Sequence, residues 1–307
     1  MSTQATDLTH GKVAHASWRD YYELGKPRIV MLIVFTAMVG MFLAVPGVVP
    51  LQQFIAGTIG IALAASCAAA INQLLDRRAD AAMFRTRRRP LPQHHVTERQ
   101  VIAYALIQCV LSMVVLLVFV NLLTAVLTFV SMIGYAVIYT GFLKRASPQN
   151  IVIGGLAGAA PPVCGWAAVT DQVAPGALLL CLIIFLWTPP HFWALAIHRR
   201  DDYAKVGIPM LPVTHGVPYT VLQIILYTIL LVMASVLPYL IGMSGLVYLA
   251  GALMLGGIFL AYAFGLHFSR NPSLPMRTFA YSIVYLTALF ILLLVDHYLP
   301  FGHAAFV

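Results

Sequence analysis

Long apolar segments, separated by short polar or proline- and glycine-containing breaks, run through most of this sequence. A run of about 20 apolar residues is long enough to cross the hydrocarbon core of a bilayer as a helix. The sequence therefore predicts an all-α, polytopic membrane bundle of nine transmembrane helices, with no need for strands. The predicted spans are residues 28–48, 51–75, 100–120, 122–142, 150–169, 175–197, 219–240, 245–267 and 278–298.

Composition favours the same class of protein. Charged residues make up 9% of the chain and hydrophobic residues 61%, whereas soluble domains carry about 25% charged residues. These values exclude a water-soluble enzyme, a disordered chain and a small disulfide-linked scaffold. We expect a single transmembrane domain over residues 28–298, preceded by a cytoplasmic segment, residues 1–27, and followed by a short tail, residues 299–307.

The positive charges predict the orientation of the helices. With nine spans, all 18 lysines and arginines fall on the same side of the membrane. Because lysine and arginine accumulate in cytoplasmic loops, we expect the N-terminus in the cytoplasm and the C-terminus outside. The net charge of +8 then follows from topology. The expected partner of this surface is the lipid bilayer, and no nucleic acid is expected.

The first polar motif lies at the cytoplasmic end of the second predicted span. Asn72, Asp76 and Asp80 follow one another at intervals of four residues, which places them on one face of a helix. Oxygen ligands at the mouth of a bundle suit Mg²⁺, which usually binds one or two carboxylates together with substrate phosphates. The alternative is an interfacial helix end whose acids pair with nearby arginines, namely Arg77, Arg78 or Arg85.

An arginine-rich loop follows this motif directly and extends to Pro92. Pro90 and Pro92 end any helix and stiffen the segment. Arginine matches phosphate oxygens in a bidentate manner, so a rigid loop of this kind beside a carboxylate site is suited to gripping a diphosphate. The alternative is that its charges set the topology and contact anionic lipid headgroups.

The second polar motif lies at the end of the sixth predicted span. If the helix continues, His191, His198 and Asp202 share one face that points toward the cytoplasm. Polar residues deep in a span are costly, so His191 is a candidate axial ligand to a porphyrin iron, a proton carrier or a hydrogen-bond partner of a substrate. The alternative is a structural histidine that bonds a backbone carbonyl freed by Pro189 or Pro190.

These motifs belong to a longer series of sequence segments that runs through most of the chain, at residues 26–29, 72–91, 139–145, 150–166, 189–192 and 202–212. Together they resemble the UbiA superfamily of intramembrane prenyltransferases, and within it the branch that makes haem O. Many members carry a second Asp-x-x-x-Asp motif, whereas here Asp201 and Asp202 are followed by Lys205 and Val206. A glycine-containing turn is also expected after Pro92, and this sequence has Gln93-His94-His95 instead.

The resemblance implies transfer of a farnesyl group from farnesyl diphosphate to a vinyl group of haem b, with addition of water, to give haem O. The farnesyl tail would occupy an apolar, lipid-open cavity. Haem b would be a substrate rather than a prosthetic group, and Mg²⁺ would bind through the diphosphate. The metal ligands implied by the resemblance are Asn72, Asp76, Asp80 and Asp202.

The resemblance also implies roles for the other polar residues. Arg85, Arg89 and Lys144 would neutralise the departing diphosphate, where negative charge develops, and act with Asp76 and Asp80 as the catalytic residues. Substrate binding is implied for a further set of residues, namely Asn72, Tyr139, His191, Asp201, Asp202 and Tyr203.

The implied location is the inner (plasma) membrane of a bacterium, and the implied downstream partners are a haem A synthase or terminal-oxidase assembly factors. Two other functions are compatible with parts of the sequence. A related prenyltransferase acting on an aromatic acid or quinone precursor would be expected to show the complete second acidic motif. A transporter would be expected to place charged residues deep in several spans and to show inverted repeats.

Overall fold

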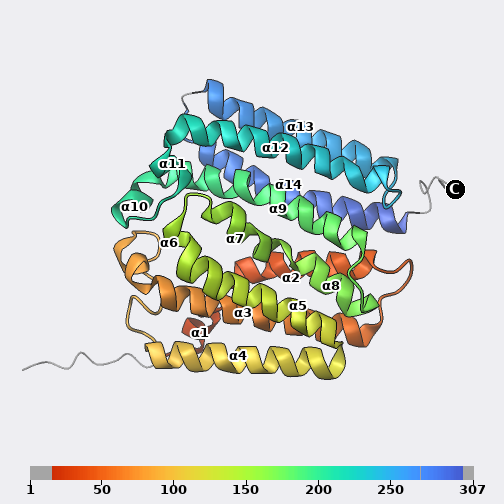
Figure 1. The fold of residues 1–307 in the computed structure, drawn as a ribbon, viewed down its shortest axis with the longest axis horizontal. Coiled ribbons are helices and arrows are strands. Elements are labelled where there is room, and N and C mark those ends of the chain that lie inside the picture. Colours follow the sequence, from red (N-terminus) through yellow and green to blue (C-terminus); the bar gives the residue numbers. More distant parts are fainter. Residues whose placement is uncertain (1–15, 270, 300–307) are drawn as a thin grey trace, which may run out of the picture.

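The computed structural model of the protein describes residues 16–269 and 271–299, and every regular element within them is helical (Figure 1). The expectation of an all-α fold is confirmed for this part of the chain. The elements are α1 (Trp18–Leu24), α2 (Pro27–Leu43), α3 (Leu51–Ala82), α4 (Glu98–Phe119), α5 (Leu122–Ile133), the π-helix η1 (Gly134–Leu143), α6 (Lys144–Ala146), α7 (Asn150–Ala159), α8 (Pro161–Thr170), α9 (Pro175–His198), α10 (Arg200–Lys205), α11 (Leu211–Thr214), α12 (Gly216–Leu240), α13 (Leu246–Phe268) and α14 (Leu274–Tyr298).

The helices provide the predicted membrane spans. Eight of the described segments are long and apolar enough to cross a bilayer, and a ninth results if α1 and α2, which meet at an angle of 52°, are counted as one span. One span comprises α5, η1 and α6 in succession, and another comprises α7 and α8. The protein is a multi-pass membrane protein. The orientation predicted from its charges stays a prediction.

The helices run roughly parallel, and each neighbour in the chain tends to be a neighbour in space (Figure 1). One outer layer is formed by α12 and α13, and α9 and α14 pack beneath it. At the opposite side α4 lies against α3 and exposes a row of large apolar side chains, including Leu106, Val110 and Val114. A surface of this kind is suited to contact with lipid rather than with water.

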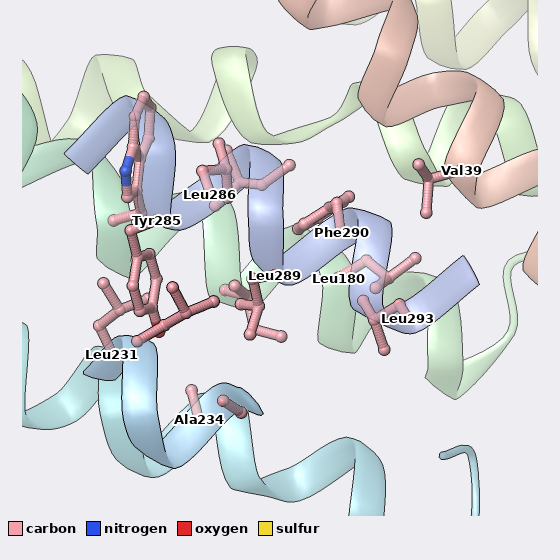
Figure 2. Close-up of a cluster of buried hydrophobic side chains, with 14 of the residues drawn as sticks. Val39, Leu180, Leu231, Ala234, Tyr285, Leu286, Leu289, Phe290 and Leu293 are labelled. Carbon is pink, nitrogen blue, oxygen red and sulfur yellow. The ribbon is translucent and has the colours of Figure 1, made fainter. Parts of the chain in front are cut away.

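The largest buried apolar cluster lies where α9, α12 and α14 meet and continues toward α2 (Figure 2). Leu180, Leu231, Tyr285 and Phe290 are among its buried members, and Figure 2 shows them converging around the blue α14 ribbon. The Tyr285 hydroxyl lies 2.7 Å from the Ser235 hydroxyl, so its polar end is hydrogen-bonded within the core. This cluster fixes α14 in the bundle.

One end of the bundle gathers the polar connections. The short helices α6, α10 and α11 lie there, together with the loop between α3 and α4 (Figure 1). Helix α3 extends to Ala82, well beyond the predicted boundary at residue 75, so the Asn72–Asp80 motif lies on a continuous helix. Within the loop, His94 adopts a left-handed conformation with φ of 57°. The backbone conformation that favours glycine is therefore present although no glycine occurs there.

The prediction of one continuous helix through His191, His198 and Asp202 is wrong. Helix α9 ends at His198, because Arg199 leaves helical geometry with ψ of 20°. Asp202 lies in the separate short helix α10. His191 is buried in the bundle, whereas His198 is exposed at its end. The three residues therefore do not form one helical stripe.

Two glycines allow α2 and α8 to approach closely. A Cβ atom at Gly40 would lie 2.3 Å from the carbonyl oxygen of Pro162, and one at Gly165 would lie 2.0 Å from that of Ala37. Both neighbours are backbone atoms, so neither helix can adapt by moving a side chain. Small residues at such contacts are typical of helix packing in membranes.

Gly165→Ala is therefore expected to destabilise the protein by about 1–3 kcal/mol, because α2 and α8 must separate to accommodate the methyl group. Gly158→Ala on α7 is the matched control, since a Cβ atom there meets nothing within 4 Å. The midpoint of thermal unfolding of the purified protein in detergent measures both effects. An equal shift for the two variants would contradict the packing argument.

Candidate active site

The polar motif of α3 forms the centre of the candidate site. Asn72, Asp76 and Asp80 lie on one face of the helix and all three are buried. The Asn72 amide nitrogen donates a hydrogen bond to Asp76 Oδ2 over 3.2 Å, one helical turn further on. The sequence-based prediction that these residues share one face is confirmed.

A different basic residue engages each of these three side chains. Lys26 Nζ lies 2.5 Å from Asn72 Oδ1, and Lys144 Nζ lies 2.5 Å from Asp76 Oδ2. Arg89 Nη1 lies 2.5 Å from Asp80 Oδ2. The three cations come from the break between α1 and α2, from α6 and from the loop after α3. These contacts join four segments of the chain along two turns of α3.

These pairs differ from the alternative prediction, in which the acids pair with Arg77, Arg78 or Arg85. Arg77 pairs with Glu98, at 2.7 Å between Nε and Oε1, rather than with the acids of the motif. Arg78 and Arg85 are exposed, and no ion pair joins either of them to Asp76 or Asp80. The acids do pair with cations, but with Lys144 and Arg89, which lie farther along the chain.

The π-helix η1 positions the other side of the site. Its wider turns place the Thr140 hydroxyl 2.9 Å from the carbonyl oxygen of Tyr135, to which it donates. The same hydroxyl accepts a hydrogen bond from Asn72 Nδ2 over 3.1 Å. Tyr139, one of the predicted substrate-binding residues, stacks on Tyr135 with ring centroids 5.5 Å apart. π-Helical turns occur frequently at functional sites.

The residues present fit a divalent cation. Asp76 Oδ1 is buried and has no hydrogen-bond partner, so one carboxylate oxygen beside Asn72 and Asp80 is still available. Hard oxygen donors of this type suit Mg²⁺. Among the described residues, no group of three or more histidine, cysteine, aspartate or glutamate side chains converges closely enough to hold a metal without other ligands. The set comprising Asn72, Asp76, Asp80 and Asp202 stays a prediction.

Helix α10 contributes the second acidic segment. Asp202 Oδ2 lies 3.8 Å from Arg199 Nη1, and Asp201 is exposed. Burial raises the pKa of the Tyr203 phenol above its usual value, while the positive charge of Arg85 opposes this change and the negative charge of Asp76 adds to it. Tyr203 is therefore a neutral hydrogen-bond donor near both the arginine loop and α3 at physiological pH.

His191 lies inside the bundle between two aromatic rings. It stacks on Trp187 with ring centroids 4.2 Å apart and on Phe279 with centroids 4.5 Å apart. Its Nδ1 atom lies 2.6 Å from the Ser282 hydroxyl of α14. The predicted alternative, a bond to a carbonyl freed by Pro189 or Pro190, is not the contact that the structure records.

The Ser282 hydroxyl has a second hydrogen-bond partner besides His191 Nδ1. The single hydroxyl proton of Ser282 is donated to the carbonyl oxygen of Phe279 over 2.6 Å. With the hydroxyl proton engaged in this way, the hydroxyl oxygen accepts from His191 Nδ1–H. In this network Nε2 carries the lone pair, with both faces of the ring covered by aromatic side chains.

A model of the UbiA prenyltransferase family matches residues 33–294 of this sequence. The chain belongs to the UbiA prenyltransferase family. Curated relatives named protohaem IX farnesyltransferase support this assignment over almost the full length. The relative from Methylococcus capsulatus is 61% identical over 97% of this chain and 99% of its own, and that from Thioalkalivibrio sulfidiphilus is 58% identical over 95% and 97%.

Solved structures confirm the UbiA fold at low sequence identity. A digeranylgeranylglyceryl phosphate synthase superposes with a TM-score of 0.77 at 16% identity, over 91% of this chain and 98% of its own. A UbiA homologue from Archaeoglobus fulgidus bound to GPP and Mg²⁺ gives a TM-score of 0.65 at 16% identity, over 89% and 99%. The arrangement of helices is therefore that of the family.

Some contacts of this UbiA-family site could not be assigned from the sequence. Lys26 belongs to a segment that resembles the family, but its contact with Asn72 joins residues far apart in the chain. The position of Lys26 before the first span, on the same side of the membrane as the acids, was the sequence feature that could have placed it at the site. Thr140 lies in segment 139–145, which resembles the family, but its contact with Asn72 was not predicted. Ser282 gave no signal, since single hydroxyl residues in apolar helices are commonly bonded to their own backbone.

Arg89→Ala is expected to lower the stability of the metal-free protein by about 1–3 kcal/mol, because it leaves the buried Asp80 carboxylate without its cation. Arg77→Ala removes an equal charge from a pair whose side chains are 37% and 53% exposed, and should cost less than about 1 kcal/mol. Thermal unfolding in detergent with a chelator measures the difference. Equal losses of stability in Arg89→Ala and Arg77→Ala would show that the Arg89–Asp80 pair stabilises the protein no more than a surface ion pair does.

Proposed function

We propose that this protein transfers the farnesyl group of farnesyl diphosphate to a vinyl group of haem b and thereby forms haem O. The observation that carries this proposal is 61% identity to a protohaem IX farnesyltransferase over 97% of the chain. The bond between farnesyl C1 and the diphosphate oxygen breaks, and a carbon–carbon bond forms between C1 and the vinyl group. Water adds at the neighbouring carbon and releases a proton, while diphosphate leaves.

The diphosphate end of the substrate belongs at the polar end of the bundle. Asn72, Asp76 and Asp80 would hold Mg²⁺ there, with Asp202 as a further ligand from α10. The unpartnered Asp76 Oδ1 atom supports this role, because the motif offers an oxygen that the protein itself does not use. When bound, Mg²⁺ supplies Lewis-acid stabilisation of the negative charge on the diphosphate.

The basic residues act on the leaving group. Lys144 and Arg89 lie at the acids of α3, and Arg85 lies close enough to Tyr203 for its charge to affect the phenol. Positive charge preorganised where negative charge develops lowers the barrier to departure of the diphosphate. Tyr203 and Asp201 would contact the substrate from α10, and Tyr139 would contact it from η1.

The apolar interior protects the allylic cation. A farnesyl cation reacts with water unless water is excluded, so the acceptor must meet it in a dry site. The apolar side chains of α2, α9 and α14 would provide such surroundings. The protein supplies no covalent nucleophile in this proposal.

His191 would face the haem. Its Nε2 lone pair is the part of the neutral ring that the Ser282 contact and the aromatic stack leave available. The membrane would be the bacterial inner membrane, since the curated relatives are bacterial and the positive residues predict a cytoplasmic polar end. A haem A synthase or terminal-oxidase assembly factors are proposed as the proteins that receive the product.

The direct test is to incubate membranes containing the protein with haem b, farnesyl diphosphate and Mg²⁺ and to detect haem O by mass spectrometry. Asp76→Asn and Asp80→Asn should each abolish product while the amount of inserted protein is unchanged, because the amide is a much weaker ligand for Mg²⁺. Wild-type turnover in either variant would remove the metal assignment.

Asp171→Asn is the control for this substitution. Asp171 is exposed in the connection between α8 and α9, and its left-handed φ of 53° is well tolerated by asparagine. This variant should form haem O at the wild-type rate. Prenylation of an aromatic acceptor but not of haem would instead identify the related prenyltransferase activity.

His191→Ala should raise the KM for haem b more than the KM for farnesyl diphosphate, because the histidine lies in the apolar interior away from the diphosphate cluster. His198→Ala on the exposed end of the same helix is the control and should leave both constants unchanged. Initial rates measured with each substrate varied in turn provide the comparison. Equal increases in both constants for His191→Ala would assign the residue a purely structural role.

A further inference from the structure

Each of the three polar residues of the α3 motif contacts one cation. Lys26 engages Asn72, Lys144 engages Asp76 and Arg89 engages Asp80, each over 2.5 Å. The oxygen atoms that the cations occupy belong to the same groups that are proposed to hold Mg²⁺. Asp76 Oδ1 is open to a metal ion. A metal ion that also binds Asn72 Oδ1, Asp76 Oδ2 or Asp80 Oδ2 must displace the ammonium or guanidinium group from that atom.

Lys26 is held firmly in this arrangement. Its backbone is in the left-handed region, with φ of 49°, and Pro27 follows it at the start of α2. Gln73 Nε2 donates to the carbonyl oxygens of Glu23 and Leu24 over 3.1 Å each, which ties the end of α1 to α3. The short α1 and its junction with α2 thus place the Lys26 ammonium beside the acids. No role in the reaction was assigned to Lys26 from the sequence.

The orientation of the Asn72 amide shows that Lys26 and a metal ion would compete for its oxygen atom. A lysine ammonium can only donate, so Asn72 Oδ1 must face Lys26. The nitrogen of the same amide donates to Asp76 and Thr140. Asn72 therefore has one oxygen available, and it can be used by Lys26 or by a metal ion at a given time.

We infer that the site works by exchange: Mg²⁺ replaces Lys26, Lys144 and Arg89 at the oxygen ligands, and the three released cations bind the diphosphate. The inference rests on the proposed function for the identity of the anion. Mg²⁺ alone competes with the cations, and diphosphate alone finds them engaged. Binding of Mg²⁺ therefore strengthens binding of diphosphate, and the reverse. Each basic residue weakens the binding of Mg²⁺ and strengthens the binding of diphosphate.

This exchange predicts effects of opposite sign from one substitution. Lys144→Met removes the charge but keeps the length of the side chain. It should bind Mg²⁺ alone more tightly than the wild type, by about fivefold or more, because the competitor at Asp76 is gone. With Mg²⁺ saturating, it should bind farnesyl diphosphate more weakly by about tenfold, the loss of one charge-assisted hydrogen bond.

Isothermal titration calorimetry on the full-length protein in lipid nanodiscs, without haem, measures both affinities. Arg145→Met is the matched control, because it removes the same charge one residue along, and the Arg145 guanidinium contacts the Leu75 carbonyl oxygen rather than an acid. It should change both affinities less than twofold. Lys26→Met provides the same test at Asn72. It replaces Lys144→Met if size-exclusion chromatography shows that the latter variant is unstable.

Unchanged or weaker binding of Mg²⁺ alone by Lys144→Met or its Lys26→Met substitute would overturn the exchange. An equal increase in Mg²⁺ affinity in Arg145→Met would also overturn the exchange, since the increase would then reflect the overall charge of the protein. Haem O formation by the wild type is measured on the same preparation. If haem O forms and the opposite effects are absent, the exchange fails and the proposed function stands. If the opposite effects appear without haem O, the acceptor assignment fails.

Discussion

Two carboxylates are buried at the end of an otherwise apolar bundle, and the architecture of the site depends on compensating their charge. Removing an ion from water costs several kcal/mol even after relaxation of the protein, about the entire stability of a small domain. Asp76 and Asp80 meet this requirement through Lys144 and Arg89. Because those cations come from α6 and from the loop after α3, the contacts that neutralise the acids also hold three segments together.

The bundle separates two kinds of chemistry along its length. The ion pairs of Asp76 and Asp80 lie at one end of the bundle, where Figure 1 shows α6, α10 and the loop between α3 and α4. The apolar layers between α9, α12 and α14 fill the interior, with His191 fixed among aromatic rings (Figure 2 shows the neighbouring cluster). A diphosphate requires the first environment, and a reactive isoprenoid cation requires the second. A single membrane domain can provide both without a covalent intermediate on the protein.

The sequence predicted the shared helical face of the acidic motif better than the contacts of its residues. The common face of Asn72, Asp76 and Asp80 follows from helical periodicity, and α3 preserves it. The partners of the acids were not predictable, because Lys144 Nζ reaches Asp76 from a position 68 residues away. The single stripe through His191 and Asp202 was wrong because the backbone leaves helical geometry at Arg199, where no proline or glycine marks the end of the helix.

The sequence by itself determined that this chain is a bundle of membrane helices, because apolar runs of spanning length leave the backbone no other way to satisfy its hydrogen bonds in lipid. It also determined which acids share a face, since that depends only on local periodicity. Only the tertiary structure decided which cation meets which acid, that Ser282 contacts His191, and that Lys26 reaches Asn72. These contacts join distant segments, and their formation depends on how whole helices pack rather than on any local pattern.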